Sequence, residues 1–274
     1  MMELNRYLRE LERYEFLEKL GQGGNGSVYL VRDTCLNRKV ALKMMPNAEI
    51  HFFHKEVEIL KSEEIKLLPC IYDAWLMQDG TGIIVMEYVQ GENLSSYLES
   101  HQGISEETLQ KWCIALAEFL KHIHDKTPPV LYRDLKPENI MVRKNGELAV
   151  IDFGTAVCME QESYKDGKRI GTKGFASPEQ WMGKSIDRRS DIYSLGMVMK
   201  VLYENSLYRS LELGKIIEKC TRDLPEKRYM TIHGVLKDLK EYPYKEKRKL
   251  IKERLWYVLK IVILLMIIYK LFFA

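Results

Sequence analysis

The sequence predicts an α+β protein of two lobes, a small one rich in strands and a larger one that is mainly helical. Residues 14–89 carry short apolar runs typical of β-strands, with one helical stretch among them. Residues 94–240 carry longer apolar stripes at helical spacing. The connector at residues 89–93 joins the two lobes, and the crevice between them is the expected place for a small ligand.

The individual elements follow from the apolar pattern of each lobe. In the first lobe, the pattern predicts one helix at residues 51–63 and strands at residues 16–20, 27–32, 39–44, 72–77 and 82–88. The clearest helix of the second lobe covers residues 106–124, where apolar side chains form one stripe: Leu109, Trp112, Cys113, Leu116, Phe119, Leu120 and Ile123. Residues 1–13 are expected to form a short amphipathic extension ahead of both lobes.

Composition narrows the class of protein. The 274 residues are 46% hydrophobic and 30% charged, which is typical of a folded chain rather than a disordered one. A formal net charge of +3 does not favour a nucleic-acid partner. The five cysteines include no closely spaced pair, so reduced thiols are expected. The charged N-terminus lacks the apolar core of a secretory signal, which places the bulk of the chain in the cytoplasm.

A glycine-rich stretch lies between the first two predicted strands, with Gly21, Gly23 and Gly26 followed by Val28. Glycines let the backbone approach phosphate groups and offer N–H donors to them. A dinucleotide site is disfavoured because a strand, not a helix, is predicted to follow. A hairpin that binds no ligand remains an alternative for this stretch taken alone.

A lysine, Lys43, ends the apolar run of the third strand. A lysine in such a strand is costly without a partner, and Glu56 on the predicted helix is the expected one. An ordinary solvated pair is the alternative.

Two further motifs bring together the groups needed for phosphoryl transfer. Within residues 132–139, Asp134 can accept the proton of a hydroxyl group and Lys136 can steady a phosphoryl group. Asn139 and Asp152, the latter in the motif at residues 151–154, are oxygen ligands of the kind that Mg²⁺ prefers. A magnesium ion that bridges the phosphates of ATP would neutralise the charge that develops during transfer.

In this order, the four motifs resemble the signature of the protein kinase family over residues 14–240. The resemblance implies a bilobal protein kinase fold, ATP and Mg²⁺ as cofactors, and protein substrates that bear serine or threonine. It implies that Lys43 binds the α and β phosphates, that Asp134 is the catalytic base and that Asn139 and Asp152 bind Mg²⁺. The residues implied to surround the adenine are Val28, Ala41, Met141, the gatekeeper Met86 and the backbone of Glu87 and Val89.

The resemblance extends to the segment after Asp152. Lys136 in the catalytic loop and Thr172 resemble the residues that the serine/threonine branch of the family has at these places, and not those of the tyrosine branch. A buried pair between Glu179 and Arg228 is implied, and Asp191 is implied to brace the catalytic loop. Arg133 resembles the arginine that receives a phosphate in many relatives, with candidate sites at Ser163 and Tyr164. Whether either is phosphorylated, by the protein itself or by another kinase, stays open.

The chain departs from the family pattern at three places. Tyr132 stands where the catalytic loop usually has histidine, and Ser177 stands where alanine usually precedes Pro178. Residues 204–219 are shorter than the corresponding stretch of most relatives, so a helix that often docks substrates is expected to be reduced or missing. None of these changes removes a catalytic group.

The tail predicts a membrane anchor. Residues 255–273 would form a helix about 28 Å long, close to the roughly 30 Å of a bilayer core. Lys260 and Lys270 lie towards its ends, and the basic segment at residues 241–254 precedes it, as the positive-inside rule requires. We therefore expect a single-pass anchor in contact with membrane lipid, with the kinase domain in the cytoplasm. An interfacial helix and a helix that packs on a partner are the alternatives.

Two other functions compete with an active protein kinase. A pseudokinase that binds nucleotide without transfer is disfavoured because Lys43, Asp134, Asn139 and Asp152 are all present. A small-molecule kinase of the antibiotic phosphotransferase type would not be expected to carry the segment at residues 171–179.

Overall fold

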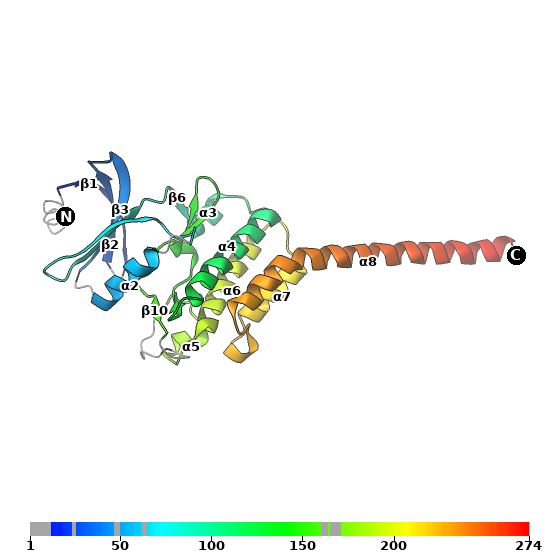
Figure 1. The fold of residues 1–274 in the computed structure, drawn as a ribbon. Helices are drawn as coiled ribbons and strands as arrows, with labels where there is room; N and C mark the ends of the chain where they lie inside the picture. The colour runs from blue at the N-terminus through cyan, green and yellow to red at the C-terminus, as the bar shows by residue number, and fades with distance from the viewer. Residues whose placement is uncertain are drawn as a thin grey trace.

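Figure 1 shows the computed structural model of the chain, which has a small sheet-containing lobe, a helical lobe and a long C-terminal helix. The structure describes residues 12–23, 26–46, 50–61, 65–159, 164 and 171–273. The predicted amphipathic extension, except for its last two residues, and Ser163 lie outside these residues. The five cysteines all lie within the described residues and carry free thiols there.

The small lobe is built on a five-stranded antiparallel sheet with the strand order β1-β2-β3-β5-β4. Its strands are β1 (Tyr14–Gly23), β2 (Gly26–Asp33), β3 (Arg38–Met45), β4 (Ile71–Leu76) and β5 (Gly82–Glu87). These match the predicted runs with small shifts at the ends. One face carries a buried cluster that includes Val40, Leu42 and Val85, which alternate with residues of the other face.

The strand register sets which residues share the second face of this sheet. Val28 lies opposite Lys43, Leu30 opposite Ala41, and Ala41 opposite Met86. Residues that lie directly opposite each other in an antiparallel pair point to the same face. The register therefore places four predicted nucleotide-site residues, Val28, Ala41, Lys43 and Met86, on one face of the sheet.

A single described helix, α2 (Ile50–Leu60), packs on the small lobe. Phe53, Val57 and Leu60 are buried in the large hydrophobic core, which continues into the second lobe. This spacing puts Glu56 on the buried side of the helix as well, at 3% exposure. The predicted helix covered the same stretch but extended to residue 63, whereas α2 ends at Leu60.

The second lobe is mainly helical. Its helices are α3 (Leu94–Ser100), α4 (Glu106–His124), α5 (Pro178–Trp181), α6 (Arg188–Glu204), α7 (Leu211–Cys220) and α8 (Ile232–Phe273). Its short strands are β6 (Gly91–Asn93), β7 (Val130–Leu131), β8 (Ile140–Arg143), β9 (Leu148–Val150) and β10 (Val157–Cys158). The 3-10 turns η1 (Pro137–Asn139) and η2 (Pro225–Lys227) complete it.

Helix α4 has the predicted bounds and buries the whole predicted apolar stripe. The side chain of Ser105 accepts a hydrogen bond from the backbone N–H of Thr108, which satisfies one of the free N–H groups at the start of the helix. Acidic residues in the first turn and basic residues in the last turn complement the helix dipole. The helix is thus defined by its own sequence at both ends.

The stretch between α6 and η2 holds one described helix, α7, which packs closely on α6. A Cβ atom added at Gly196 of α6 would lie 2.6 Å from Cβ of Cys220, so glycine permits this close approach. The described part of this stretch thus holds a single ten-residue helix, and the reduction of a docking helix relative to other family members stays a prediction.

The last helix differs from the prediction at its start. The kinase domain was expected to end at residue 240, but Tyr242 is 1% exposed and belongs to the core. Helix α8 packs on α4 and α7 with its first turns and then runs on without a break to Phe273, away from the lobe (Figure 1). The predicted basic segment and tail therefore continue a helix of the core.

The exposed end of α8 carries apolar side chains from Leu255 to Ile267, with Lys260 among them. In the part of the chain that the structure describes, no helix is both long enough and apolar enough to cross a membrane. The predicted span at residues 255–273 includes residues 268–273, whose side chains the structure does not describe.

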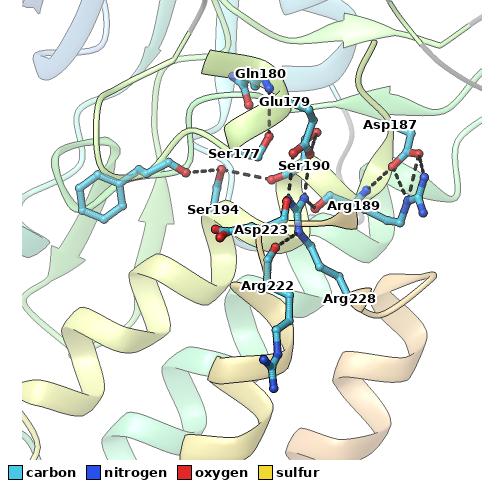
Figure 2. Close-up of polar contacts among 11 residues, drawn as sticks. Ser177, Glu179, Gln180, Asp187, Arg189, Ser190, Ser194, Arg222, Asp223 and Arg228 are labelled. Atoms are coloured by element: carbon cyan, nitrogen blue, oxygen red, sulfur yellow. Dashed lines mark hydrogen bonds and ion pairs between the residues drawn. The ribbon is translucent and has the colours of Figure 1, made fainter. Parts of the chain in front are cut away.

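A buried ion pair fixes the base of the second lobe (Figure 2). Arg228 donates from Nη1 to Oε1 of Glu179 at 2.7 Å and from Nη2 to Oε2 at 2.9 Å, which confirms the predicted pair. Ser190 donates to the same carboxylate at 2.7 Å. Burial alone would raise the pKa of Glu179, but the hydrogen bonds from Arg228 and Ser190 outweigh it and hold the pKa below its ordinary value.

Replacing Arg228 with methionine should destabilise the fold by about 3–5 kcal/mol, because the Glu179 carboxylate would stay buried without its cation. Urea unfolding followed by circular dichroism measures this loss. Arg222→Met is the matched control, since the Arg222–Glu218 pair lies at the surface and contributes little. Equal stability of the two variants would contradict the prediction.

Candidate active site

Lys43 lies at the centre of a charge cluster between the lobes, in which Lys43 and Glu56 are buried and the Asp152 side chain is 44% exposed. Its Nζ atom is 2.6 Å from Oε1 of Glu56 and 2.9 Å from Oδ1 of Asp152. The predicted pairing with Glu56 is therefore present, and Asp152 joins it from the second lobe. Burial alone would lower the pKa of Lys43, but the two carboxylates outweigh it, so the pKa is raised and the lysine stays protonated.

Asp152 is held in an unusual backbone conformation. Its φ of 68° lies in the left-handed region, which aspartate tolerates better than most residues. Burial alone would raise the pKa of Asp152, but Lys43 and the N–H of Gly154 hold it below its ordinary value. The carboxylate is thus anionic and fixed, as a ligand for a cation must be.

Tyr132, the departure from the usual histidine, contacts the residue before Asp152. Its hydroxyl donates to the carbonyl oxygen of Ile151 at 2.8 Å. Burial raises the pKa of Tyr132 well above its ordinary value, so the hydroxyl keeps its proton. Its ring packs edge-on against those of Phe119 and Phe153, with centroid distances of 5.4 Å and 5.2 Å. The tyrosine therefore supports the Asp152 backbone through one hydrogen bond and an aromatic cluster.

A second cluster surrounds Asp134. Thr172 donates from its hydroxyl to Oδ1 at 2.8 Å, and Nζ of Lys136 lies 2.9 Å from Oδ2. Lys136 also donates to the hydroxyl oxygen of Thr172 at 2.7 Å. Asn139 donates from Nδ2 to the carbonyl oxygen of Asp134 at 2.9 Å and to Oδ2 at 3.1 Å. The carboxylate thus has a fixed orientation and is only 13% exposed.

The catalytic loop is braced by Asp191, as predicted. This carboxylate is 1% exposed and accepts hydrogen bonds from the backbone N–H groups of Tyr132 at 2.9 Å and Arg133 at 2.8 Å. His124 at the end of α4 lies 2.8 Å from the carboxylate through Nε2. Arg133 adopts a left-handed φ of 74° between these contacts. Three elements therefore meet at one buried carboxylate.

The glycine-rich stretch forms the hairpin between β1 and β2. Gly21 pairs with Val28, and Gly23 pairs with Gly26. Gly26 has a φ of +136°, and a Cβ atom there would lie 2.1 Å from the carbonyl oxygen of Met44. Only glycine fits at this position. At Gly21 and Gly23 the space is open, which leaves the backbone accessible to a ligand.

An ion pair that was not predicted from the sequence links the end of β5, just before the connector, to the second lobe. Glu87 binds the guanidinium of Arg143 on β8 through both carboxylate oxygens. The hydrogen bond from Arg143 holds the pKa of Glu87 below its ordinary value. The N–H of Glu87 donates to the carbonyl of Cys70 at 2.8 Å, so the predicted adenine contact of its backbone can involve only the carbonyl oxygen. Val89 is buried beside it.

The donor set fits Mg²⁺. Asn139 directs its amide nitrogen at Asp134, which leaves its amide oxygen for a cation. The N–H of Ile151 donates to the carbonyl of Asn139 at 2.9 Å, which brings Asn139 and Asp152 onto neighbouring strand ends. Within the described residues no group of three or more His, Cys, Asp or Glu side chains could hold a metal by itself. A magnesium ion held by Asn139 and Asp152 would therefore take its remaining ligands from phosphate and water.

The predicted lower wall of the adenine site, Met141, lies on β8 opposite Ala149 of β9. The structure describes one of the two candidate phosphorylation sites. Tyr164 places its ring 5.3 Å from the guanidinium carbon of Arg133, so this arginine is already covered by an aromatic ring.

Two of these contacts could not be assigned from the sequence. Thr172 was read only as a mark of the serine/threonine branch, although its hydroxyl bridges Asp134 and Lys136. His124 was a polar residue next to an apolar stripe, and that placement was its only signal.

These clusters lie between the two lobes and bring together the lysine, carboxylate and amide groups that phosphoryl transfer requires. The protein kinase domain family matches residues 14–255, and the chain belongs to this family. Its relatives include a probable serine/threonine-protein kinase of Clostridium acetobutylicum, at 30% identity over 83% of this chain and 39% of the relative. Serine/threonine-protein kinase PrkC of Bacillus subtilis is 31% identical over 68% of this chain and 30% of its own length. A serine/threonine-protein kinase of Myxococcus xanthus is 36% identical over 68% of this chain and 24% of its own length. The chain thus spans less than half the length of each of these relatives.

Removing the Thr172 hydroxyl should impair catalysis while ATP binding is retained. In Thr172→Val the carboxylate of Asp134 loses one fixed donor, and we expect kcat to fall by about tenfold or more, with KM for ATP unchanged. Steady-state phosphorylation of casein measures both constants. Thr172→Ser, which keeps the hydroxyl, should stay close to the wild type, and equal loss in both variants would contradict the role of the hydroxyl.

Proposed function

We propose that this protein is an ATP-dependent serine/threonine protein kinase. The observation that carries the proposal is that both clusters are assembled at once: Lys43 pairs with Glu56 and Asp152, while Asp134 is held by Lys136 and Thr172. The family membership and the printed names of the relatives support the same activity. Protein serine and threonine hydroxyls are the proposed acceptors, and the chain itself can be one of them.

In the proposed reaction, a substrate hydroxyl attacks the γ-phosphorus of ATP. The new O–P bond forms as the bond between the γ-phosphorus and the bridging β-oxygen breaks, so ADP leaves and the hydroxyl proton passes to Asp134. Lys43 holds the α and β phosphates, and Lys136 stabilises the transferred group. The Thr172 hydroxyl keeps the Asp134 carboxylate aimed at the acceptor.

Nucleotide binding is proposed on the face of the sheet that carries Lys43. Val28 and Ala41 cover the adenine from above and Met141 from below, with Met86 at the back of the pocket. The backbone of Glu87 and Val89 meets the edge of the ring. The loop at Gly21, Gly23 and Gly26 covers the phosphates. Bound Mg²⁺, held by Asn139 and Asp152, would neutralise charge on the phosphates.

A pseudokinase is the weaker alternative. Loss of transfer usually follows loss of the lysine, the base or a metal ligand, and here all are present and connected by hydrogen bonds. A small-molecule kinase is also disfavoured, because the segment after Gly171 is anchored on the catalytic loop, as expected for a kinase that positions a protein substrate.

The deciding measurement is the transfer of labelled γ-phosphate to casein and to the chain itself. Asp134→Asn keeps the size of the side chain but cannot accept the proton, so transfer should fall by at least about 100-fold. Asp187→Asn is a matched control, because Asp187 is partly exposed and pairs with Arg189 at the start of α6. Equal labelling by the wild type and Asp134→Asn would refute the proposed function.

We also propose that the end of α8 attaches the kinase to a membrane, with the catalytic lobes in the cytoplasm. Apolar side chains from Leu255 to Ile267 are exposed all round this helix, and the segment at residues 241–254 ahead of it is rich in lysine and arginine. Such a surface is unfavourable in water and gains free energy on transfer to lipid. The basic residues would lie against anionic headgroups.

Alkaline carbonate extraction of membranes tests this attachment. The full chain should stay in the membrane pellet, whereas a chain that lacks residues 255–274 should be soluble. A full chain that pellets at neutral pH but is released by carbonate would instead indicate a helix that lies on the surface. A full chain that never pellets would refute membrane attachment.

A further inference from the structure

Gln180 makes a buried contact with the catalytic loop that none of the motifs explains. It lies in α5, directly after Glu179, and is 3% exposed. Its Nε2 atom donates to the carbonyl oxygen of Arg133 at 2.6 Å. Arg133 is the residue before Asp134, so this carbonyl belongs to the peptide group that leads directly into the catalytic carboxylate.

The backbone at Arg133 requires such support. Its φ of 74° is left-handed, which is unfavourable for a residue with a long side chain. Asp191 holds its N–H at 2.8 Å, and Gln180 holds its carbonyl at 2.6 Å. The backbone N–H and the backbone carbonyl of Arg133 are therefore both held by buried side chains, the first by Asp191 of α6 and the second by Gln180 of α5.

Gln180 is itself fixed by its neighbours (Figure 2). The hydroxyl of Ser177 accepts from the backbone N–H of Gln180 at 3.4 Å. Glu179, the preceding residue, is anchored by Arg228 and Ser190. The backbone that carries the Gln180 side chain is therefore held by contacts of Gln180 itself and of the residue before it.

Gly171 shows that the chain leaves room for this contact. It has a φ of +112°, and a Cβ atom there would lie 2.7 Å from Nε2 of Gln180 and 2.8 Å from Cβ of Ala176. Any other residue would displace the amide that binds Arg133. The next residue, Thr172, donates to Asp134, so the same turn serves both the backbone and the side chain of the base.

We propose that Gln180 is a positioning residue for Asp134: its amide fixes the Arg133–Asp134 peptide and so couples the buried Glu179–Arg228 pair to the catalytic carboxylate. The proposal rests on the kinase activity proposed above. Among the described residues, Gln180 donates hydrogen bonds to Ser177 and Arg133, and the second of these leads to Asp134. The proposal therefore assigns its effect to the chemical step and not to ATP binding.

The test compares Gln180→Met and Gln180→Glu with the wild type on casein. Both variants keep the approximate size of the side chain, and neither can donate as the amide does at neutral pH. We expect kcat to fall by about 10- to 100-fold with KM for ATP unchanged, because a small misplacement of the base costs this much. Gln102→Met, at an exposed loop position, is the matched control and should equal the wild type.

A double-mutant cycle separates positioning from general damage to the fold. If Gln180 acts through Asp134, then adding Gln180→Met to Asp134→Asn should not lower the residual transfer further. Thermal unfolding shows whether each variant is folded. If Gln180→Met does not fold, Gln180→Glu takes its place in the cycle. Unchanged kcat in a folded variant, or additive losses in the cycle, would overturn the proposal. A wild type without transfer would instead refute the kinase activity itself.

Discussion

The active site depends on the burial of one carboxylate, Asp191, at the start of α6. A buried charge is tolerated only where donors surround it, and here two backbone N–H groups of the catalytic loop and His124 fill that role. The N-terminal end of α6 adds a favourable dipole. Because the donors come from the loop itself, the loop cannot adopt another path without leaving the charge unsatisfied. The left-handed conformation at Arg133 follows from this constraint.

A second buried cluster makes the two lobes interdependent. Lys43 belongs to the sheet, Glu56 to α2 and Asp152 to the helical lobe. Lys43 and Glu56 are buried, and the partly exposed Asp152 completes the charge compensation. If α2 moved outward, Lys43 would be left with Asp152 alone and Glu56 would lose its cation. The position of α2 thus decides how Lys43, the proposed phosphate-binding residue, is held. The Glu87–Arg143 pair adds a second link across the connector.

Much of the fold and the site could be predicted because local patterns carry them. The strands and helix α4 follow from periodicity, and the Lys43–Glu56 pair follows from the cost of a lysine without a partner in an apolar strand. The Glu179–Arg228 pair was implied only by the resemblance to the protein kinase family. The contacts of Thr172, His124 and Gln180 were not predicted, because each joins residues 36 to 67 positions apart through tertiary packing and no motif pairs these residues. The boundary predicted at residue 240 falls inside α8: Tyr242 packs in the core, and the helix continues through Pro243, a residue type that usually ends or kinks a helix.

The continuity of α8 gives the chain a geometric property. Its first turns belong to the core through Tyr242, and its last turns lie well outside the lobe, without an intervening loop. From Pro243 to Phe273 the helix extends roughly 45 Å at about 1.5 Å per residue. Each inserted or deleted residue would rotate the far end by about 100° relative to the catalytic cleft. The length and the continuous backbone of α8 therefore set two quantities: the distance of the two lobes from whatever binds the end of the helix, and their orientation relative to it.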